Sequence, residues 1–187
     1  GNKVILAGEI NSQAKISLEE TRNSIIKTVN QIGYTSDIPC QFRVDNLDIQ
    51  SYLKPQSLNI HMGVDKTDGE VGAGDQGIMF GYATNETEEF LLPLPYVVAA
   101  DILTTINWKI YEGILPGIFT DNKSQVCCLY ENGNIEIKKI ILSSFHDPNL
   151  SIADVRKILS KEIIEEIFEK YSRIYLPVQG TFPLYYL

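Results

Sequence analysis

The sequence predicts an α+β protein, with mostly antiparallel sheets and helices packed on one face of them. Two observations lead to this class. Apolar side chains recur at helical spacing over residues 17–33, 96–112 and 151–172. Apolar, β-branched runs bounded by turn residues alternate with these helices, as strands would. The order of the elements also suggests a repeated unit.

The first elements have clear boundaries. Residues 3–10 form a mostly apolar, β-branched run that predicts a strand. Ser17 is followed by Glu20 three residues later, which is the capping-box pattern for the start of a helix, and Gly33 supplies the stop. Residues 39–60 contain short apolar pieces broken by a proline, and they fit neither element clearly.

The second half of the chain predicts further strands and helices. We expect a strand at 78–84, a helix at 96–112, strands at 124–130 and 134–145 joined by an Asn132-Gly133 turn, and a helix at 151–172. The predicted organisation is a strand-helix-strand unit over 1–61, a glycine- and aspartate-rich active-site loop over 62–75, and a second unit over 76–187 with three strands and two helices.

Composition excludes several classes of function. The chain has 187 residues and a formal net charge of −8, which argues against a nucleic-acid partner or an anionic membrane surface. It contains no apolar run long enough to span a membrane and does not open with a signal-peptide pattern. Three cysteines, of which Cys127 and Cys128 are adjacent, are not a disulfide framework. We therefore expect a cytoplasmic protein.

The most unusual segment is GAGDQGIMFGYATNET at residues 72–87. Its glycines match the Gly-x-Gly-x-x-Gly fingerprint of dinucleotide-binding proteins. That fingerprint requires a strand before the glycines and a helix after them. Here the preceding residues 64–71 are polar, the following residues favour a strand, and Asp75 puts a negative charge where a phosphate would lie. The sequence context therefore argues against a dinucleotide site.

The whole segment resembles the signature of the S-adenosylmethionine synthetase (methionine adenosyltransferase) family. Further similarities follow in the family's order along the chain: residues 4–10 (VILAGEI), 32–34 (IGY), 56–65, 115–126 (with LP and DNKSQV) and 142–146 (LSSFH). The resemblance covers nearly the whole chain and weakens after about His146. It implies a fold of repeated units around a pseudo-threefold axis and an enzyme that makes S-adenosylmethionine from ATP and methionine, releasing phosphate and pyrophosphate.

The resemblance also implies roles for particular residues. Two positions match methionine-binding residues, Glu9 and Gln56. The positions that match ATP-binding residues are Asp121, Asn122, Lys123, Thr181 and Phe182. Asp75, in the glycine loop, and Lys123 are the expected catalytic residues, since the reaction needs alignment of the substrates and neutralisation of the triphosphate. The family implies Mg²⁺ and K⁺ as cofactors, and a homo-oligomer (a dimer or a dimer of dimers) or a partner subunit.

Departures from the family pattern leave alternatives open. The family's His-Pro-Asp-Lys segment, with a catalytic histidine and a metal-binding aspartate, has no counterpart here, so we expect the metal ligands to lie outside this chain. Thr181 and Phe119 stand where the family has arginines. We therefore expect an incomplete synthetase chain. The alternatives are a non-catalytic or regulatory synthetase-like subunit that pairs with an active partner and, with least support, an unrelated nucleotide-binding domain.

Overall fold

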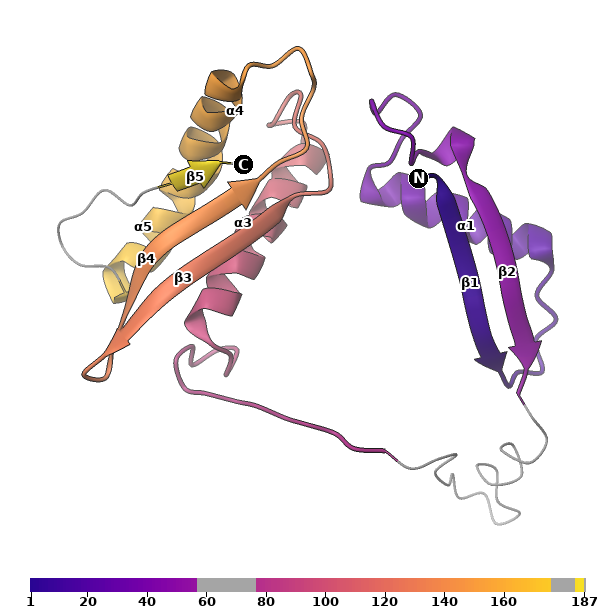
Figure 1. The fold of residues 1–187 in the computed structure, drawn as a ribbon, viewed down its shortest axis with the longest axis horizontal. Helices are drawn as coiled ribbons and strands as arrows, with labels where there is room; N and C mark the ends of the chain where they lie inside the picture. Colours follow the sequence, from indigo (N-terminus) through magenta and orange to yellow (C-terminus); the bar gives the residue numbers. More distant parts are fainter. Residues whose placement is uncertain (57–76, 176–183, 187) are drawn as a thin grey trace. The chain divides into compact units, whose positions relative to one another are not determined.

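The computed structural model describes residues 1–56, 77–175 and 184–186, and Figure 1 follows the chain through its helices and strands. The chain divides into two compact units, Gly1–Gly81 and Tyr82–Leu187. Each unit combines helices with strands, so the predicted α+β class is confirmed. The sequence predicts mostly antiparallel sheets, whereas in the described residues two strands of the second unit pair antiparallel and the other strand pairs are parallel.

The first unit is a parallel strand-helix-strand motif. Strand β1 (Lys3–Ile10) pairs in parallel with β2 (Asp48–Pro55), and helix α1 (Leu18–Ile32) lies between them in the chain. Parallel neighbours need a crossover connection, which this helix supplies. The strand predicted at 3–10 is confirmed. Strand β2 lies within residues 39–60, which the sequence left unassigned.

Helix α1 begins and ends where the sequence predicts. The hydroxyl oxygen of Ser17 accepts a hydrogen bond from the Glu20 N–H at 3.1 Å, and the Glu20 carboxylate accepts one from the Ser17 N–H at 2.8 Å. This reciprocal pair satisfies two N–H groups that the helix leaves free. Gly33 closes the helix with φ of 108°, a conformation that favours glycine.

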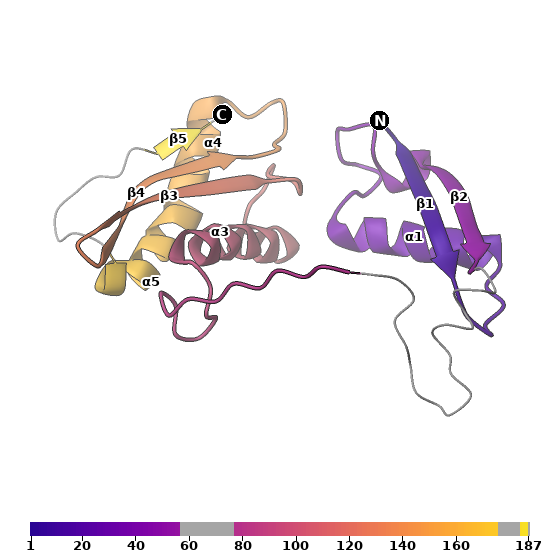
Figure 2. The same ribbon diagram turned by 60° about the horizontal axis from the view of Figure 1, so that its bottom comes forward.

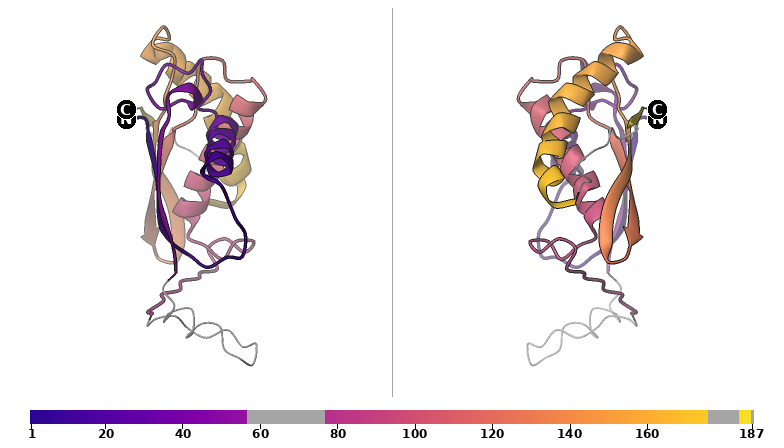
Figure 3. Two further views of the ribbon diagram at one scale, coloured as in Figure 1. Left: turned by 90° about the vertical axis from the view of Figure 1, so that its right-hand side faces the viewer. Right: turned by 90° about the vertical axis from the view of Figure 1, so that its left-hand side faces the viewer.

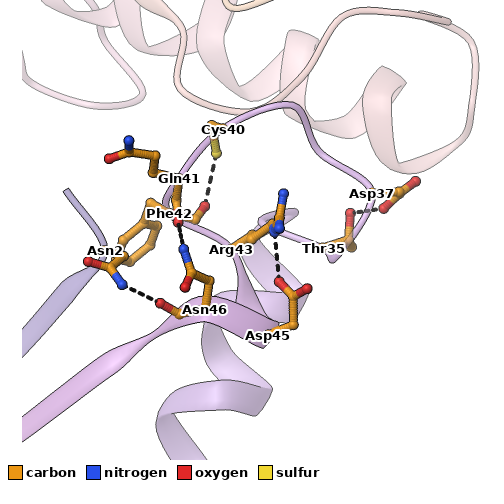
Figure 4. A network of polar contacts seen from close by, with 9 residues as sticks. All are labelled: Asn2, Thr35, Asp37, Cys40, Gln41, Phe42, Arg43, Asp45 and Asn46. Atoms are coloured by element: carbon orange, nitrogen blue, oxygen red, sulfur yellow. Dashed lines mark hydrogen bonds and ion pairs between the residues drawn. The ribbon is translucent and has the colours of Figure 1, made fainter.

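The connection from α1 to β2 is held by side-chain amides (Figure 4). It contains a short 3₁₀ turn, η1 (Val44–Asn46). The Asn46 amide donates to the Gln41 carbonyl at 3.1 Å, and the Asn2 amide donates to the Asn46 carbonyl at 2.6 Å. Because Asn2 immediately precedes β1, these bonds tie the starts of both strands together.

The sheet of the second unit contains β3 (Lys123–Glu131), β4 (Asn134–Ser143) and the short β5 (Leu184–Tyr186), in that order. β3 and β4 form an antiparallel hairpin, and β5 adds in parallel to β4. The hairpin turns at Asn132 and Gly133, whose φ angles are 51° and 78°. The predicted Asn-Gly turn is confirmed, since such two-residue turns need positive φ at both positions.

A β-bulge divides the hairpin into two registers. Near the tip Cys128 lies opposite Ile137, whereas on the other side of the bulge Cys127 lies opposite Lys139. Lys138 is therefore the extra residue in β4. A bulge of this kind shifts every later pair by one position.

The helices of the second unit lie on one face of the sheet (Figures 2 and 3). They are α3 (Leu94–Tyr111), followed by α4 (Ile152–Leu159), the π-helical turn η2 (Ser160–Ile164) and α5 (Glu165–Tyr175). The last three run on without a break, which confirms the long helix predicted at 151–172. None of the helices in the described residues is long and apolar enough to cross a membrane.

The apolar core of the second unit lies between this sheet and its helices. Leu94, Val98, Ile102 and Ile106 of α3 are almost fully buried at helical spacing. They pack with a matching set from the hairpin and the long helix: Ile137, Ile140, Leu142, Val155, Leu159, Ile163, Ile164 and Ile167. Each such side chain contributes roughly 1.5–3 kcal/mol by burial.

The strand predicted at 78–84 is wrong for the described structure. These residues belong to no strand, and Ile78, Met79 and Phe80 are 83, 94 and 94% exposed. Apolar and aromatic composition favours a strand only where a neighbouring strand supplies hydrogen bonds and a packing surface. Within the described ranges, no strand pairs with this segment.

A buried lysine contacts the π-helical turn. Lys109 of α3 is 8% exposed, and its ammonium group donates to the backbone carbonyl of Glu162, inside η2. The same ammonium group lies 2.9 Å from the Glu166 carboxylate and 3.7 Å from that of Glu162. A π turn disturbs the regular i→i−4 ladder, and Lys109 supplies a donor to a carbonyl within it.

We predict that Lys109→Met destabilises the protein by about 2 kcal/mol, because the partly buried Glu162 carbonyl then loses its donor and the Glu166 carboxylate loses its ion pair. The measurement is the free energy of unfolding in urea. Lys161→Met is the matched control, since Lys161 lies in the same turn but its side chain is 72% exposed. That change is expected to cost less than about 0.5 kcal/mol. Equal losses for the two variants would contradict this role for Lys109.

Glu86 links the start of α3 to strand β3. Its carboxylate accepts a hydrogen bond from the Leu94 N–H at 2.9 Å and another from the Tyr130 hydroxyl at 2.9 Å. A carboxylate is favoured at a helix N-terminus by the free N–H groups and the helix dipole. Burial, then the hydrogen bond to Glu86 and its negative charge, raises the pKa of Tyr130 to about 12.

We predict that Glu86→Gln lowers the pKa of Tyr130 toward the usual value near 10. Carbon-13 NMR of the Tyr130 ring would follow the titration. The raised pKa of Tyr130 makes a contribution to the free energy of unfolding that is fully present below about pH 10. This contribution is lost as the pH rises through 12. The loss of stability between these pH values should accordingly be smaller in Glu86→Gln. A Tyr130 pKa unchanged by the substitution would show that the carboxylate has no part in it.

Candidate functional site

The two candidate methionine-binding residues lie at the same edge of the first unit. Glu9 is the penultimate residue of β1, and Gln56 directly follows β2. Because the strands are parallel, their carboxyl ends meet, and the Gln56 N–H donates to the Ile10 carbonyl at 2.9 Å. Glu9 is exposed and Gln56 is half-buried. A carboxylate and an amide are thus presented together, as the ammonium and carboxylate groups of an amino acid would require.

The candidate ATP-binding segment forms a turn that enters β3 in the second unit. The turn lies against the chain that leaves β4: Ile118 bridges to His146, and the Phe119 N–H donates to the Phe145 carbonyl at 2.8 Å. The Phe119 and Phe145 rings also pack, with centroids 5.2 Å apart. Phe119 therefore offers an aromatic ring at the position where the family resemblance leads us to expect a cation.

Gly117 is required at the start of this turn. Its φ is 76°, and a Cβ atom added there would lie 2.7 Å from Cδ1 of Leu150. Its carbonyl accepts a hydrogen bond from the Asp147 N–H at 2.8 Å. Only glycine has both the backbone freedom and the space for this close approach.

Asp121 and Lys123 are exposed on either side of Asn122. Asp121 has φ of 73°, in the left-handed region that aspartate and asparagine enter more readily than other side chains. Lys123 is the first residue of β3 and pairs with Ser143. The turn thus presents a carboxylate and an ammonium group close together in the chain, suited to the polar and phosphate parts of a nucleotide.

Asn122 lies differently from its neighbours. Its amide nitrogen donates to the Phe119 carbonyl at 2.8 Å, and its amide oxygen accepts from the Ser144 hydroxyl at 2.6 Å. Both ends of the amide are therefore bonded within the protein. Ser144 is the residue of this site that sequence reasoning missed. The only signal was its place in the LSSFH string.

Three further candidates, Asp75, Thr181 and Phe182, lie outside the described residues. Glu9 and Gln56 come together within the first unit, and Asp121, Asn122 and Lys123 within the second. In the described part of the chain, no three His, Cys, Asp or Glu side chains form a group that could hold a metal ion. The Mg²⁺ and K⁺ implied by the family resemblance stay predictions.

The half-buried Cys128 is not an alternative catalytic group. Burial, followed by the negative charges of Glu86 and Cys127, raises the pKa of Cys128 to about 11. The thiolate is the nucleophilic form of cysteine, so this thiol is unreactive near neutral pH.

Comparisons with known proteins agree with the fold described above. Residues 70–182 match the family model for the central domain of S-adenosylmethionine synthetase. The chain is 37% identical to the S-adenosylmethionine synthase of Pelagibacter ubique (strain HTCC1062), over 97% of this chain and 48% of that protein. It is 35% identical to the synthase of Helicobacter pylori (strain P12), over 89% of this chain and 42% of that protein.

A solved structure shares the fold. It is described as an unusual S-adenosylmethionine synthetase from Campylobacter jejuni, and the TM-score is 0.76 at 27% identity, over 100% of this chain and 46% of that one. Together these matches define the class as a synthetase-type α+β protein with a central-domain unit. The chain belongs to the S-adenosylmethionine synthetase family. It spans about half the length of the relatives it matches.

We predict that two substitutions of Asp121 distinguish the effect of its left-handed backbone from the effect of its charge. Asp121→Asn should leave the melting temperature unchanged, because asparagine also tolerates positive φ. Asp121→Val should destabilise the fold by about 1–2 kcal/mol, because a β-branched side chain is strained there. Thermal and urea unfolding would measure both. Equal stability of the two variants would argue against a positive φ angle at Asp121 in the folded protein.

Proposed function

We propose that this chain is part of a methionine adenosyltransferase, which joins ATP and methionine to form S-adenosylmethionine. The observation that carries the proposal is the exposed pair Asp121 and Lys123 in a hydrogen-bonded turn, within the region that matches the family's central domain. Glu9 and Gln56, at one edge of the first unit, support it with groups complementary to an amino acid.

The reaction sets what these residues have to do. The methionine sulfur attacks C5′ of the ribose and displaces the triphosphate, which is then hydrolysed to phosphate and pyrophosphate. The thioether sulfur needs no base, so the protein contributes alignment and charge neutralisation. In this proposal Asp121 accepts a hydrogen bond from the nucleoside and Lys123 places a positive charge beside the phosphates. Asp75 is assigned to the region between the adenosine and the methionine ammonium.

The proposal for the whole enzyme also includes Mg²⁺ and K⁺ as cofactors. Mg²⁺ would neutralise the triphosphate charge when bound. Because no metal-binding group is found among the described residues, no step here runs through a metal held by them. Homo-oligomerisation, or pairing with a partner subunit, belongs to the proposal because of the family resemblance, whereas a cytoplasmic location belongs to it because of the cysteine composition.

A second candidate is a non-catalytic or regulatory synthetase-like subunit. The favouring observation is Phe119, whose ring packs on Phe145 where the family has an arginine. Of the described candidate site residues, Lys123 alone is cationic, against the acids Glu9 and Asp121. Such a subunit would bind an active partner and contribute no turnover of its own.

We predict that the whole protein of which this chain is part, incubated with ATP, methionine, Mg²⁺ and K⁺, forms S-adenosylmethionine that is detectable by mass spectrometry. Lys123→Ala should lower the rate by about 100-fold through loss of a charge at the triphosphate. Asp121→Asn should lower it as well, without loss of stability. The matched control is Lys157→Ala, on the exposed side of α4.

The remaining outcomes discriminate the candidates. If product forms only after a chain with the His-Pro-Asp-Lys segment is added, the reaction needs both chains and still depends on Lys123. If a partner binds and no mixture turns over, the regulatory subunit is the better interpretation. Wild-type rates from Lys123→Ala would overturn the role given to Lys123.

A further inference from the structure

The turn that carries Asp121 is closed by a chain of two hydrogen bonds. Ser144 donates to the Asn122 side-chain oxygen at 2.6 Å, and the Asn122 side-chain nitrogen donates to the Phe119 carbonyl at 2.8 Å. The second bond spans Thr120 and Asp121, so it fixes the backbone on both sides of Asp121. All these residues lie within the second unit.

The register of the hairpin brings the two side chains together. Lys123, the first residue of β3, pairs with Ser143, the last residue of β4, so the same register places Asn122, just before β3, opposite Ser144, just after β4. In the register near the hairpin tip, where Glu131 pairs with Asn134, Asn122 would instead face Ser143. The bulge at Lys138 produces the difference. The Ser144–Asn122 bond therefore depends on a bulge that lies six residues from Ser144 and sixteen residues from Asn122 along the chain.

The backbone at Asp121 requires such support. A residue other than glycine with φ of 73° is held in a sparsely populated conformation, which persists only where the surroundings determine it. The Asp121 side chain is exposed, and among the described residues none outside the turn forms a hydrogen bond or ion pair with it. Its direction is consequently set by the turn itself, and through it by Asn122 and Ser144.

We infer that Asn122 and Ser144 are positioning residues for nucleotide binding: they fix the direction of the Asp121 carboxylate relative to the Lys123 ammonium, and neither touches the nucleotide. The inference rests on the proposed function, and it changes the role of Asn122 from a nucleotide contact to a support for its neighbours. It also assigns a role to Ser144, which directly follows β4.

The test measures ATP affinity by calorimetry in Asn122→Ala, Ser144→Ala and the double variant. Each single change should raise the Kd for ATP roughly tenfold, the value of one hydrogen bond of about 1.4 kcal/mol. The double variant should be no weaker than the single variants, because both act through one chain of bonds. Ser144→Thr keeps the hydroxyl and should restore wild-type affinity.

A stability-matched control separates positioning from folding. Ser151→Ala removes the cap of α4, where the Ser151 hydroxyl accepts from the Asp154 N–H at 3.2 Å, and should lower the melting temperature without changing ATP affinity. A second readout is the three-bond HN–Hα coupling of Asp121, which reports its φ angle. It should change in Asn122→Ala and Ser144→Ala and stay constant in Ser151→Ala.

Two results would overturn the inference. One is wild-type ATP affinity in Asn122→Ala or Ser144→Ala, which would make their bonds merely structural. The other is an Asp121 coupling that neither substitution changes. If the wild-type chain binds no ATP, the proposed function fails, while the coupling still decides whether Asn122 and Ser144 set the Asp121 backbone.

Discussion

The second unit depends on one constraint, the burial of a single apolar layer between its sheet and its helices. Leu94, Ile102 and Ile106 of α3 are completely buried against it, and so are Leu159 and Ile163 of the long helix. This layer holds the hairpin in place, and the hairpin in turn holds the turn that carries Asp121. In the described part of the first unit, buried apolar side chains are far fewer: Val29, Ile38 and Leu47. Its polar edge depends more on hydrogen bonds such as those around Asn46.

Local sequence signals predicted the elements whose causes are local. Ser17 with Glu20 marked the start of a helix, and Asn132 with Gly133 marked a hairpin turn, because each pair acts within a few residues. The strand expected at 78–84 failed for the opposite reason, since a strand depends on a partner that no local pattern contains. The parallel pairing of β1 with β2 was likewise not visible, as it is decided by the path of the connection and not by composition.

The candidate site likewise contains residues that sequence similarity identifies and residues that only the structure reveals. Family similarity named Glu9, Gln56, Asp121 and Lys123, and the described structure gives each a location at a strand end. Family similarity could not reveal Ser144, because its contact with Asn122 follows from a register that changes within β4. Nor could it show that the Asn122 amide is bonded at both ends. Residues that contact a ligand leave a signature in sequence, whereas residues that hold those contacts in place need coordinates to be found.

The bulge at Lys138 has a consequence for how this hairpin can vary in length. A deletion of that one residue would leave every pair of the hairpin as it is, from Glu131 with Asn134 at the tip to Lys123 with Ser143 at the base, because Lys138 has no partner in β3. Deletion of a paired residue between the bulge and the base, such as Ile140, would instead bring the next residue along the chain opposite each later position of β3 and move Ser144 out of register with Asn122. A relative that is one residue shorter here can therefore keep the contact between this serine and asparagine only where the missing residue is the bulged one.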